Sequence, residues 1–422
     1  MPESRLPLAL YHGARDPYNA RPLTAYQDPL LSFRARFPIT QRTNYLISNS
    51  LGAMPAAARA SVGQFLDMWD TRGVRAWAEG WWVLQEQVGN VLEGVLGVAS
   101  STVSMHQNIA VALEMILSCF EFQSSRNRIV YCELNFPSDQ YIYEAQARRG
   151  AELVRVPANH DGIATDLQRL LDAIDERTRI VAIDHVHFRS AYIQDAKAIV
   201  DKARKVGAFV ILDVFHSAGT LPLELAAMGV HAAVGGALKY LCGGPGNCFL
   251  YVDPGERRHL TPTFTGWAAH KQPFLFSSKG QDYRLDAGRF FTGTPNVPAL
   301  FAGKEGIASV AEAGMTAIRA KSQRLTALLI AEAQRAGLGI KSPLADNERG
   351  GHVALDVPHG YEVCQTLLAE DIVVDFRPEA GLRIAPHFYN TDDEVRACVR
   401  RVRAILDNGE HQRFLKQDRR PG

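Results

Sequence analysis

The chain has 422 residues, of which 46% are hydrophobic and 22% charged, and its formal net charge is +1. This is ordinary globular composition with enough apolar material for a sizeable core, and the near-zero net charge gives no reason to expect a nucleic acid or an anionic membrane as a partner. No apolar stretch is long enough to span a bilayer and the six cysteines form no C-x-x-C pair, so we expect neither a membrane protein, nor a disulfide framework, nor a metal site.

The N-terminal segment, residues 1–40, is rich in Pro, Arg and Tyr and shows no periodicity. It lacks a sustained apolar stretch with a cleavage site, so we expect no secretion signal and predict a cytoplasmic protein. We interpret the segment as an extended arm that packs on a partner subunit. A short strand and a turn are predicted in 43–55, and the apolar spacing then predicts helices in 56–73 and 77–97.

The middle of the chain alternates between apolar runs and helical patterns. Residues 101–120 have the pattern of a loop that enters a helix. Strands are then predicted at 127–136, 151–157, 179–188, 208–216, 232–236 and 247–253, with helices at 138–150, 164–174 and 193–207. Strands of continuous apolar character, separated by helices, indicate a mostly parallel sheet that is covered on both faces.

The pattern changes from about Ala302 onward. A long helical stretch at 303–337 is followed, between 350 and 408, by a strand, a helix, two strands and a helix. We therefore predict an α/β fold with three parts. An N-terminal arm (1–40) precedes a large domain with the mostly parallel sheet (41–310), and a small α+β domain (311–422) ends the chain.

Polar residues lie where several of the predicted strands end, and ligands of open α/β sheets collect beyond those ends. Asp213 and His216 end one apolar strand, and Lys239 lies between a small-residue run and a glycine-rich loop. Gln107 and Asn108 precede a helix start, where backbone N–H groups favour an anion. A lysine that can attack a carbonyl, an aspartate for a pyridine nitrogen and a phosphate site are together what pyridoxal phosphate requires.

Each of these residues has a simpler interpretation when taken alone. Lys239 could be a surface residue whose stem packs on the protein, Asp213 a helix cap and His216 a hydrogen-bonded packing residue. Gln107 and Asn108 could only cap a helix. Their order and joint placement favour the cofactor site.

Further motifs strengthen this interpretation. The chain contains YLISNSLGAMP (45–55), FPSDQYI (136–142), DHVHFRSAYIQDAKAI (184–199), DVFHSAGTLPLEL (213–225), LKYLCGGPG (238–246), GW (266–267), FTGTPNVPAL (291–300) and LRIAPHFYNT (382–391). These blocks resemble those of the fold-type I pyridoxal phosphate enzymes of the aminotransferase class V group, and within it the kynureninases. The resemblance extends from about Tyr45 to Asn390.

The resemblance implies roles for the residues around the cofactor ring. Lys239 would carry the cofactor covalently and later move protons. Asp213 would pair with the pyridine N–H, and Asp139 would support the same side of the ring. Phe136 would stack on the ring, and His216 would lie beside it.

The resemblance also implies a phosphate end and a substrate end. Gln107 and Asn108 lie where the family has phosphate-binding hydroxyl residues. Trp267 and Thr294 would reach the phosphate region of the neighbouring subunit in a homodimer with shared active sites. Arg383 would hold the substrate α-carboxylate in a bidentate pair.

Asn49 and Ser50 would line the substrate side. His187 is also expected there, in an HVHF segment where Asn-Tyr is common in the family. Leu238 stands where kynureninases usually have a tyrosine that is tied to the phosphate and to proton transfer.

The resemblance therefore implies hydrolytic Cβ–Cγ cleavage of L-kynurenine to anthranilate and L-alanine, a step of tryptophan catabolism. A class V aminotransferase or a β-eliminating carbon–sulfur lyase on another amino acid is the alternative. A cysteine desulfurase is disfavoured because 249–363, where its catalytic cysteine would lie, contains no cysteine. A non-catalytic relative that only binds a ligand or partner is also disfavoured, because such a protein would be expected to lack the lysine that is present here as Lys239.

Overall fold

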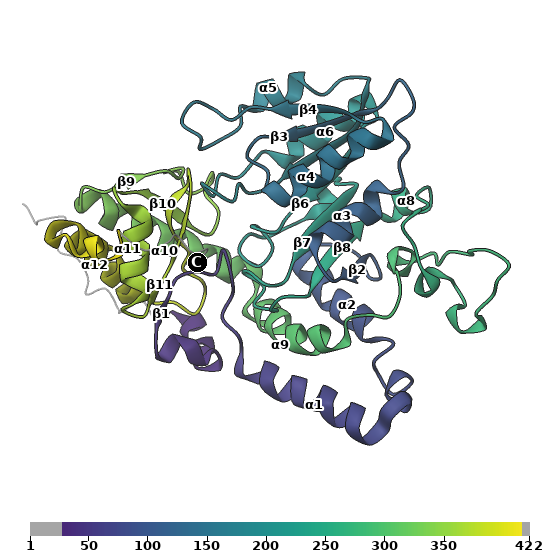
Figure 1. Cartoon of the computed structure of the whole chain (residues 1–422), viewed down its shortest axis with the longest axis horizontal. Helices are drawn as coiled ribbons and strands as arrows, with labels where there is room; N and C mark the ends of the chain where they lie inside the picture. The colour runs from purple at the N-terminus through teal and green to yellow at the C-terminus, as the bar shows by residue number, and fades with distance from the viewer. Residues whose placement is uncertain (1–27, 416–422) are drawn as a thin grey trace, which may run out of the picture.

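A computed structural model describes residues 28–415 of the chain. Its centre is a seven-stranded sheet with the strand order β2-β8-β7-β6-β5-β3-β4 (Figure 1). The strands are β2 (Val103–His106), β3 (Arg128–Cys132), β4 (Glu152–Val156), β5 (Thr178–Asp184), β6 (Phe209–Asp213), β7 (Ala232–Gly236) and β8 (Cys248–Val252). The pairs among β4, β3, β5, β6 and β7 are parallel, and β8 is antiparallel to β7 and β2. The predicted mostly parallel sheet is therefore confirmed.

Alternate residues of the central strands enter two separate cores. Val210 and Leu212 of β6 belong to one buried cluster, whereas Ile211 belongs to the other. The first cluster includes residues of α1 (Ala56–Arg72), α2 (Leu84–Leu96), α5 (Leu167–Asp172), α6 (Ala196–Val206) and α9 (Val297–Ala313), and the second includes residues of α3 (Ile109–Leu117) and α4 (Pro137–Ala145). Burial on both faces explains why these strands are apolar throughout rather than alternating.

Two sequence predictions of elements were wrong in detail. Residues 103–106, expected in a loop, form the edge strand β2, which is short and contains Ser104 and His106. The single helix expected at 303–337 is two helices, α9 and α10 (Met315–Arg335), which meet at Gly314. Gly314 has φ of +80°, a left-handed conformation that ends α9.

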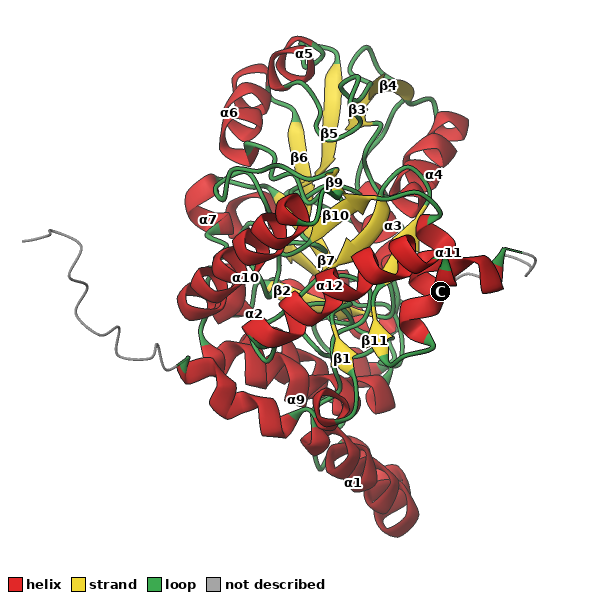
Figure 2. Cartoon of the chain, turned by 90° about the vertical axis from the view of Figure 1, so that its left-hand side faces the viewer, coloured by secondary structure: helices red, strands yellow, loops and turns green. Residues whose placement is uncertain are grey.

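A second, four-stranded sheet lies beside the first, with the order β12-β13-β10-β9. Its strands are β9 (Gly339–Ile340), β10 (Val353–Asp356), β12 (Asp375–Arg377) and β13 (Gly381–Ile384). Figure 2 shows α10, α11 (Gly360–Leu368) and α12 (Asp392–Asn408) on the outer side of this sheet. We propose that the border between the two domains lies near Gly314, close to the predicted residue 311.

Before the large sheet begins, the chain forms a separate two-stranded sheet with a strand of the C-terminal part. β1 (Asn44–Tyr45) pairs in parallel with β11 (Ile372–Val373). The remaining short elements are α7 (Leu225–Met228), α8 (Pro254–Arg257) and the 3₁₀ helices η1 (Pro29–Arg36), η2 (Pro38–Gln41), η3 (Gly73–Trp77), η4 (Gln146–Arg149), η5 (Trp267–Ala269), η6 (Pro273–Leu275), η7 (Ala287–Phe290) and η8 (Glu410–Phe414).

Most of the predicted N-terminal arm lies outside the described residues. The described part, from Asp28, packs on the chain's own C-terminal helices. The carboxylate of Asp28 pairs with Lys321 at 2.8 Å and with Arg324 at 3.0 Å, and Arg34 pairs with Glu394. Between residues 28 and 415, no helix is long and apolar enough to cross a membrane.

Candidate active site

A cavity of about 750 Å³ lies where the ends of the large-sheet strands face the second sheet. Strand ends supply Asp213 and Phe188 from one side, and β12 and β13 supply Arg377 and Arg383 from the other. Nine of the residues predicted for the site line it: Asn49, Ser50, Gln107, Asn108, Phe136, Asp213, His216, Lys239 and Arg383. Residues far apart in the sequence therefore meet in one cavity, as their joint placement predicted.

Lys239 lies in the cavity wall, in the loop that joins β7 to β8. Its Nζ atom lies 2.7 Å from Nε2 of His216 and 4.3 Å from the centre of the Phe215 ring. Removal from bulk water lowers the pKa of Lys239 to about 8, and the nearby Asp213 opposes that shift. A lysine with a pKa near 8 has an appreciable neutral fraction at physiological pH, which is the form that attacks a carbonyl.

His216 is the direct partner of this amine. Burial and the neighbouring Lys239 charge lower the pKa of His216 well below its ordinary value, so the ring is neutral. A neutral ring has one nitrogen free to accept, and Nε2 can therefore accept a hydrogen bond from the lysine amine. Its other nitrogen, Nδ1, is buried and has no hydrogen-bond partner among the described residues.

Two buried carboxyl groups, those of Asp213 and Asp139, lie near the lysine. Asp213 ends β6, and its Oδ1 accepts a hydrogen bond of 2.7 Å from the backbone N–H of Phe215. Asp139 lies in the first turn of α4, and no described group donates to either of its carboxyl oxygens. Burial raises the pKa of Asp213 to about 6, and burial together with Asp213 raises the pKa of Asp139 well above its ordinary value. Ionisation is therefore disfavoured more strongly at Asp139, and Asp213 is the better carrier of a negative charge.

A third carboxyl group, Asp184, lies beside Asp213 because the two are register partners at the ends of β5 and β6. Both of its oxygens lie 3.0 Å from Nδ1 of His187, and Gln194 donates to one of them. His187 is fully buried and contacts Thr165 on its other side. The structure thus places His187 away from the cavity, and Phe188 lines the wall instead.

Three aromatic rings border the cavity near the lysine. Phe188 meets Phe136 edge to face, with ring centroids 5.2 Å apart. Nζ of Lys239 lies over the face of the Phe136 ring, 5.5 Å from the ring centre. These rings give a flat cofactor or a flat substrate side chain surfaces on which to pack.

Arg383 lies across the cavity on β13. Its Nε donates to Oδ1 of Asp375 at 2.8 Å, and its Nη1 donates to the carbonyl oxygen of Phe188 at 2.6 Å. Arg377 also lines the cavity and lies 3.2 Å from Asp375. Arg189, from the large domain, pairs with Glu379 of the turn between β12 and β13.

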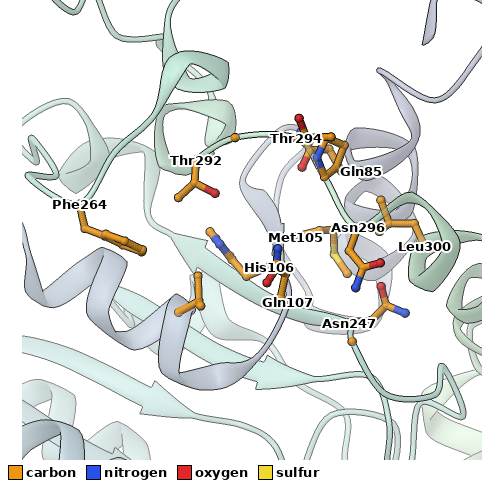
Figure 3. A pocket seen from close by; sticks show the side chains of 14 residues that line it. Gln85, Met105, His106, Gln107, Asn247, Phe264, Thr292, Thr294, Asn296 and Leu300 are labelled. Carbon is orange, nitrogen blue, oxygen red and sulfur yellow. The ribbon is translucent and has the colours of Figure 1, made fainter. Parts of the chain in front are cut away.

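The other end of the cavity opens toward the start of α3. Asn108 is the N-cap of α3, and its side chain accepts a hydrogen bond of 3.0 Å from the N–H of Val111. The start of a helix of this length presents free N–H groups and a positive dipole end, which suit a phosphate. A smaller hollow of about 200 Å³ adjoins this end and is also lined by Gln107 (Figure 3).

Trp267 and Thr294 lie on the outer side of that hollow. Thr294 lines it together with Gln107, and Figure 3 shows Thr294 at the edge of the hollow and Gln107 near its centre. Trp267 is 37% exposed and packs on Trp82 at 5.0 Å in an apolar surface groove of about 510 Å³. Neither residue lines the main cavity of its own chain.

Sequence reasoning did not single out Phe215, Asp375 or Arg377. Asp375 and Arg377 stand two residues apart in a strand, a spacing that places both on one face. Only the pairing of β12 with β13, which sets Asp375 opposite Arg383, shows that this face of the strand is turned toward the cavity.

The residues fit pyridoxal phosphate. Asp213 and Asp139 are buried, and no cationic group among the described residues donates a hydrogen bond to them. A protonated pyridine nitrogen would supply such a donor. The amine of Lys239 is suited to an aldehyde, and the start of α3 is suited to a phosphate.

Comparison with known proteins agrees with this geometry. The family model of aminotransferase class-V matches residues 60–398. A kynureninase of Burkholderia mallei (strain SAVP1) is 33% identical over 398 residues, covering 90% of this chain and 93% of that protein. A kynureninase of Bacillus cereus (strain ATCC 14579) is 30% identical over 410 residues, covering 92% and 94%.

Solved structures share the fold. The apo structure of a cysteine desulfurase from Thermococcus onnurineus NA1 superposes with a TM-score of 0.80 at 18% identity, covering 90% of this chain and 99% of that one. A C-DES mutant with glycine covalently linked to its PLP cofactor gives 0.78 at 18% identity, covering 88% and 98%. At this identity the likeness shows the fold alone, and it confirms the predicted fold class.

Proposed function

The chain belongs to the aminotransferase class-V family, and on that premise we propose that it is a pyridoxal phosphate enzyme of the kynureninase type. Its reaction would be the hydrolytic cleavage of the Cβ–Cγ bond of L-kynurenine, or of a close relative, to an anthranilate and L-alanine. The kynureninases at 30–33% identity, which align over nine-tenths of the chain, support this reaction.

The placement of Lys239 carries the proposal. Its amine lies 2.7 Å from a neutral imidazole, in a cavity that also holds Asp213. Bound pyridoxal phosphate would supply a covalent attachment point for an amino group and a ring that withdraws electrons from the neighbouring carbon. A negatively charged Asp213 would keep the pyridine nitrogen protonated, which strengthens that withdrawal.

Lys239 and His216 are placed to handle protons. With a substrate in the cavity, the Lys239 amine would be available to take up a proton from the substrate Cα. His216 holds that amine by accepting its hydrogen bond, and it does so without adding a second positive charge. The aromatic rings of Phe136, Phe188 and Phe215 line the cavity in the same region.

Arg383 and the apolar walls would select the substrate. Arg383 presents a guanidinium to the cavity, where it would bind the α-carboxylate. A volume of about 750 Å³ accommodates an aryl side chain in addition to the cofactor. Asn49 has two buried side-chain atoms without a hydrogen-bond partner among the described residues, so it is free to bind a substrate carbonyl or amine.

We further propose that the protein is a homodimer. Trp267 and Thr294 lie outside the cavity of their own chain, beside an exposed apolar groove lined by Val74, Trp82 and Phe274. A second copy that covered this groove would bury its apolar surface and bring these two residues toward the phosphate end of a neighbouring site.

Two measurements test the proposal. The purified protein is expected to show a yellow absorbance band that borohydride bleaches and that Lys239→Ala abolishes. Lys197→Ala, which removes an exposed lysine of α6, serves as the matched control and should retain the band. A wild-type protein that binds pyridoxal phosphate no better than Lys239→Ala would overturn the cofactor assignment.

The substrate is tested separately with L-kynurenine, by following the fluorescence of released anthranilate and by assaying L-alanine, pyruvate and ammonia. Release of anthranilate with L-alanine supports the kynureninase reaction. Absence of turnover with both L-kynurenine and 3-hydroxykynurenine would refute it. Pyruvate with ammonia would instead indicate β-elimination, the alternative that remains within the family.

A further inference from the structure

We infer that Asp375 is a positioning residue for Arg383. It orients the guanidinium so that one edge faces the cavity and can bind a single carboxylate. This inference rests on the proposed function, because that function assigns the substrate carboxylate to Arg383. It extends the site by a residue that does not itself line the cavity.

The backbone sets these two side chains opposite each other. β12 and β13 are antiparallel, and Asp375 is the register partner of Arg383. Partners across an antiparallel pair point to the same face of the sheet, so the carboxylate and the guanidinium meet without any loop. Asp375 is 1% exposed and Arg383 3% exposed, so water does not screen their interaction.

The hydrogen bonds fix the orientation of the guanidinium. Oδ1 of Asp375 accepts from Nε at 2.8 Å, and Oδ2 accepts from Nη2 at 2.5 Å. The carbonyl oxygen of Phe188 accepts from Nη1 at 2.6 Å. These three bonds use three of the five N–H donors of an arginine and leave one on each terminal nitrogen. Two parallel donors are what a carboxylate needs for a bidentate contact.

Two guanidinium groups keep Asp375 ionised. Asp375 lies 3.2 Å from Arg377 and also pairs with Arg383, so both groups share its carboxylate. Burial opposes ionisation of Asp375, but Arg383 and Arg377 outweigh it and hold its pKa below the ordinary value. An ionised Asp375 can therefore hold the guanidinium of Arg383 in place.

The bond to Phe188 connects this arrangement to the large domain. Phe188 follows β5, whereas Arg383 and Asp375 belong to the second sheet. The Phe188 ring meets Phe136, the residue expected to stack on the cofactor. The orientation set by Asp375 therefore also fixes the distance between the carboxylate receiver and the lysine.

The test compares two ligands that differ only in the carboxylate, L-alanine and L-alaninamide. Their dissociation constants are measured from the change in the yellow band of the cofactor-loaded protein. Asp375→Asn is expected to weaken L-alanine binding by about tenfold to a hundredfold, the range for loss of a charge-assisted pair, and to weaken L-alaninamide binding by less than about threefold. Because each variant meets the same two ligands, the difference between their amine pKa values cancels.

Two further variants separate positioning from mere stabilisation. Asp346→Asn removes a carboxylate from another buried arginine, Arg349, outside the cavity, and should leave the ratio of the two dissociation constants unchanged. Asp375→Glu keeps the charge on a longer side chain and should recover part of the preference for L-alanine. This variant also replaces Asp375→Asn if the latter does not fold. A ratio in the Asp375 variants equal to that of the wild type would overturn the inference.

A crystal structure of Asp375→Asn gives a readout that needs neither cofactor nor turnover. We expect the guanidinium of Arg383 to leave its place and to lose its hydrogen bond to the Phe188 carbonyl. An unmoved Arg383 would contradict the inference even in a protein that binds pyridoxal phosphate well. Conversely, a displaced Arg383 in a protein that binds no cofactor would sustain the inference while the proposed function failed.

Discussion

Nζ of Lys239 lies 2.7 Å from Nε2 of His216, and His216 is buried whereas Lys239 is half-buried in the cavity wall. The pKa values of both groups lie below their ordinary values, so the pair carries at most one positive charge at neutral pH. The amine therefore has a reactive neutral fraction under conditions in which an exposed lysine would have almost none.

The first prediction concerns pH. Because the pKa of Lys239 falls from 10.5 to about 8, the neutral fraction rises mainly below pH 9. When pyridoxal phosphate is added to cofactor-free protein, the initial rate of yellow-band formation should rise between about pH 7 and pH 9 and then level off. A rate that keeps rising tenfold per pH unit above 9 would show that the lysine is not perturbed.

The second prediction separates the two carboxyl groups. Asp213→Asn removes the negative charge and is expected to lower turnover at least about 100-fold, the scale for loss of a preorganised charge in a buried site. Burial and the nearby Asp213 raise the pKa of Asp139 and so favour its neutral form, which Asp139→Asn imitates, and this variant should therefore cost much less. Turnover of both variants is measured at saturating cofactor, and equal losses would refute the assignment of the charge to Asp213.

The third prediction concerns Gly52, which packs against the lysine loop. A Cβ atom there would lie 2.1 Å from the carbonyl oxygen of Lys239, and the Gly52 N–H donates to the carbonyl of Leu238 at 2.8 Å. Gly52→Ala must therefore displace the loop, and we expect weaker cofactor binding, measured by titration of the yellow band. Gly63→Ala is the control, since a Cβ in that part of α1 meets nothing and should stabilise the helix by about 0.5–1 kcal/mol. Unchanged cofactor affinity in Gly52→Ala would contradict the packing.

The fourth prediction concerns stability. Lys321 has a side chain that is 2% exposed, and its amine pairs with Asp28 at 2.8 Å. Asp28→Asn leaves this buried charge without its carboxylate and should lower the free energy of unfolding by about 3 kcal/mol, measured by chemical denaturation. Glu312→Gln breaks the exposed pair with Arg36 and should change nothing measurable, because water screens that pair. Equal effects of the two variants would show that Asp28 is not an anchor.

The sequence predicted the large sheet well because its strands are buried on both faces and are apolar throughout. It did not predict β2, because a four-residue edge strand with two polar side chains is defined by its pairing with β8 rather than by its own composition. The break between α9 and α10 depends on one left-handed glycine, and helical periodicity continues across it.

The candidate site was predictable where a residue follows directly from the end of a strand, as Asp213 does. His187 and Phe188 lie beyond the end of β5, where side chains no longer alternate regularly, and the sequence could not decide which one faces the cavity. The relation between Asp375 and Arg383 depends on the register of two strands, which the sequence does not display.

The carboxyl groups of Asp139, Asp184 and Asp213 lie together in a region that excludes water, and Asp139 has no hydrogen-bond donor among the described residues. A cationic ring nitrogen would compensate this arrangement, so cofactor loading and folding are thermodynamically linked. We expect the melting temperature to fall when the vitamer is removed by dialysis against a carbonyl-trapping amine, and to recover on its return. The lifetime of the folded polypeptide would then depend on how much pyridoxal phosphate its surroundings provide.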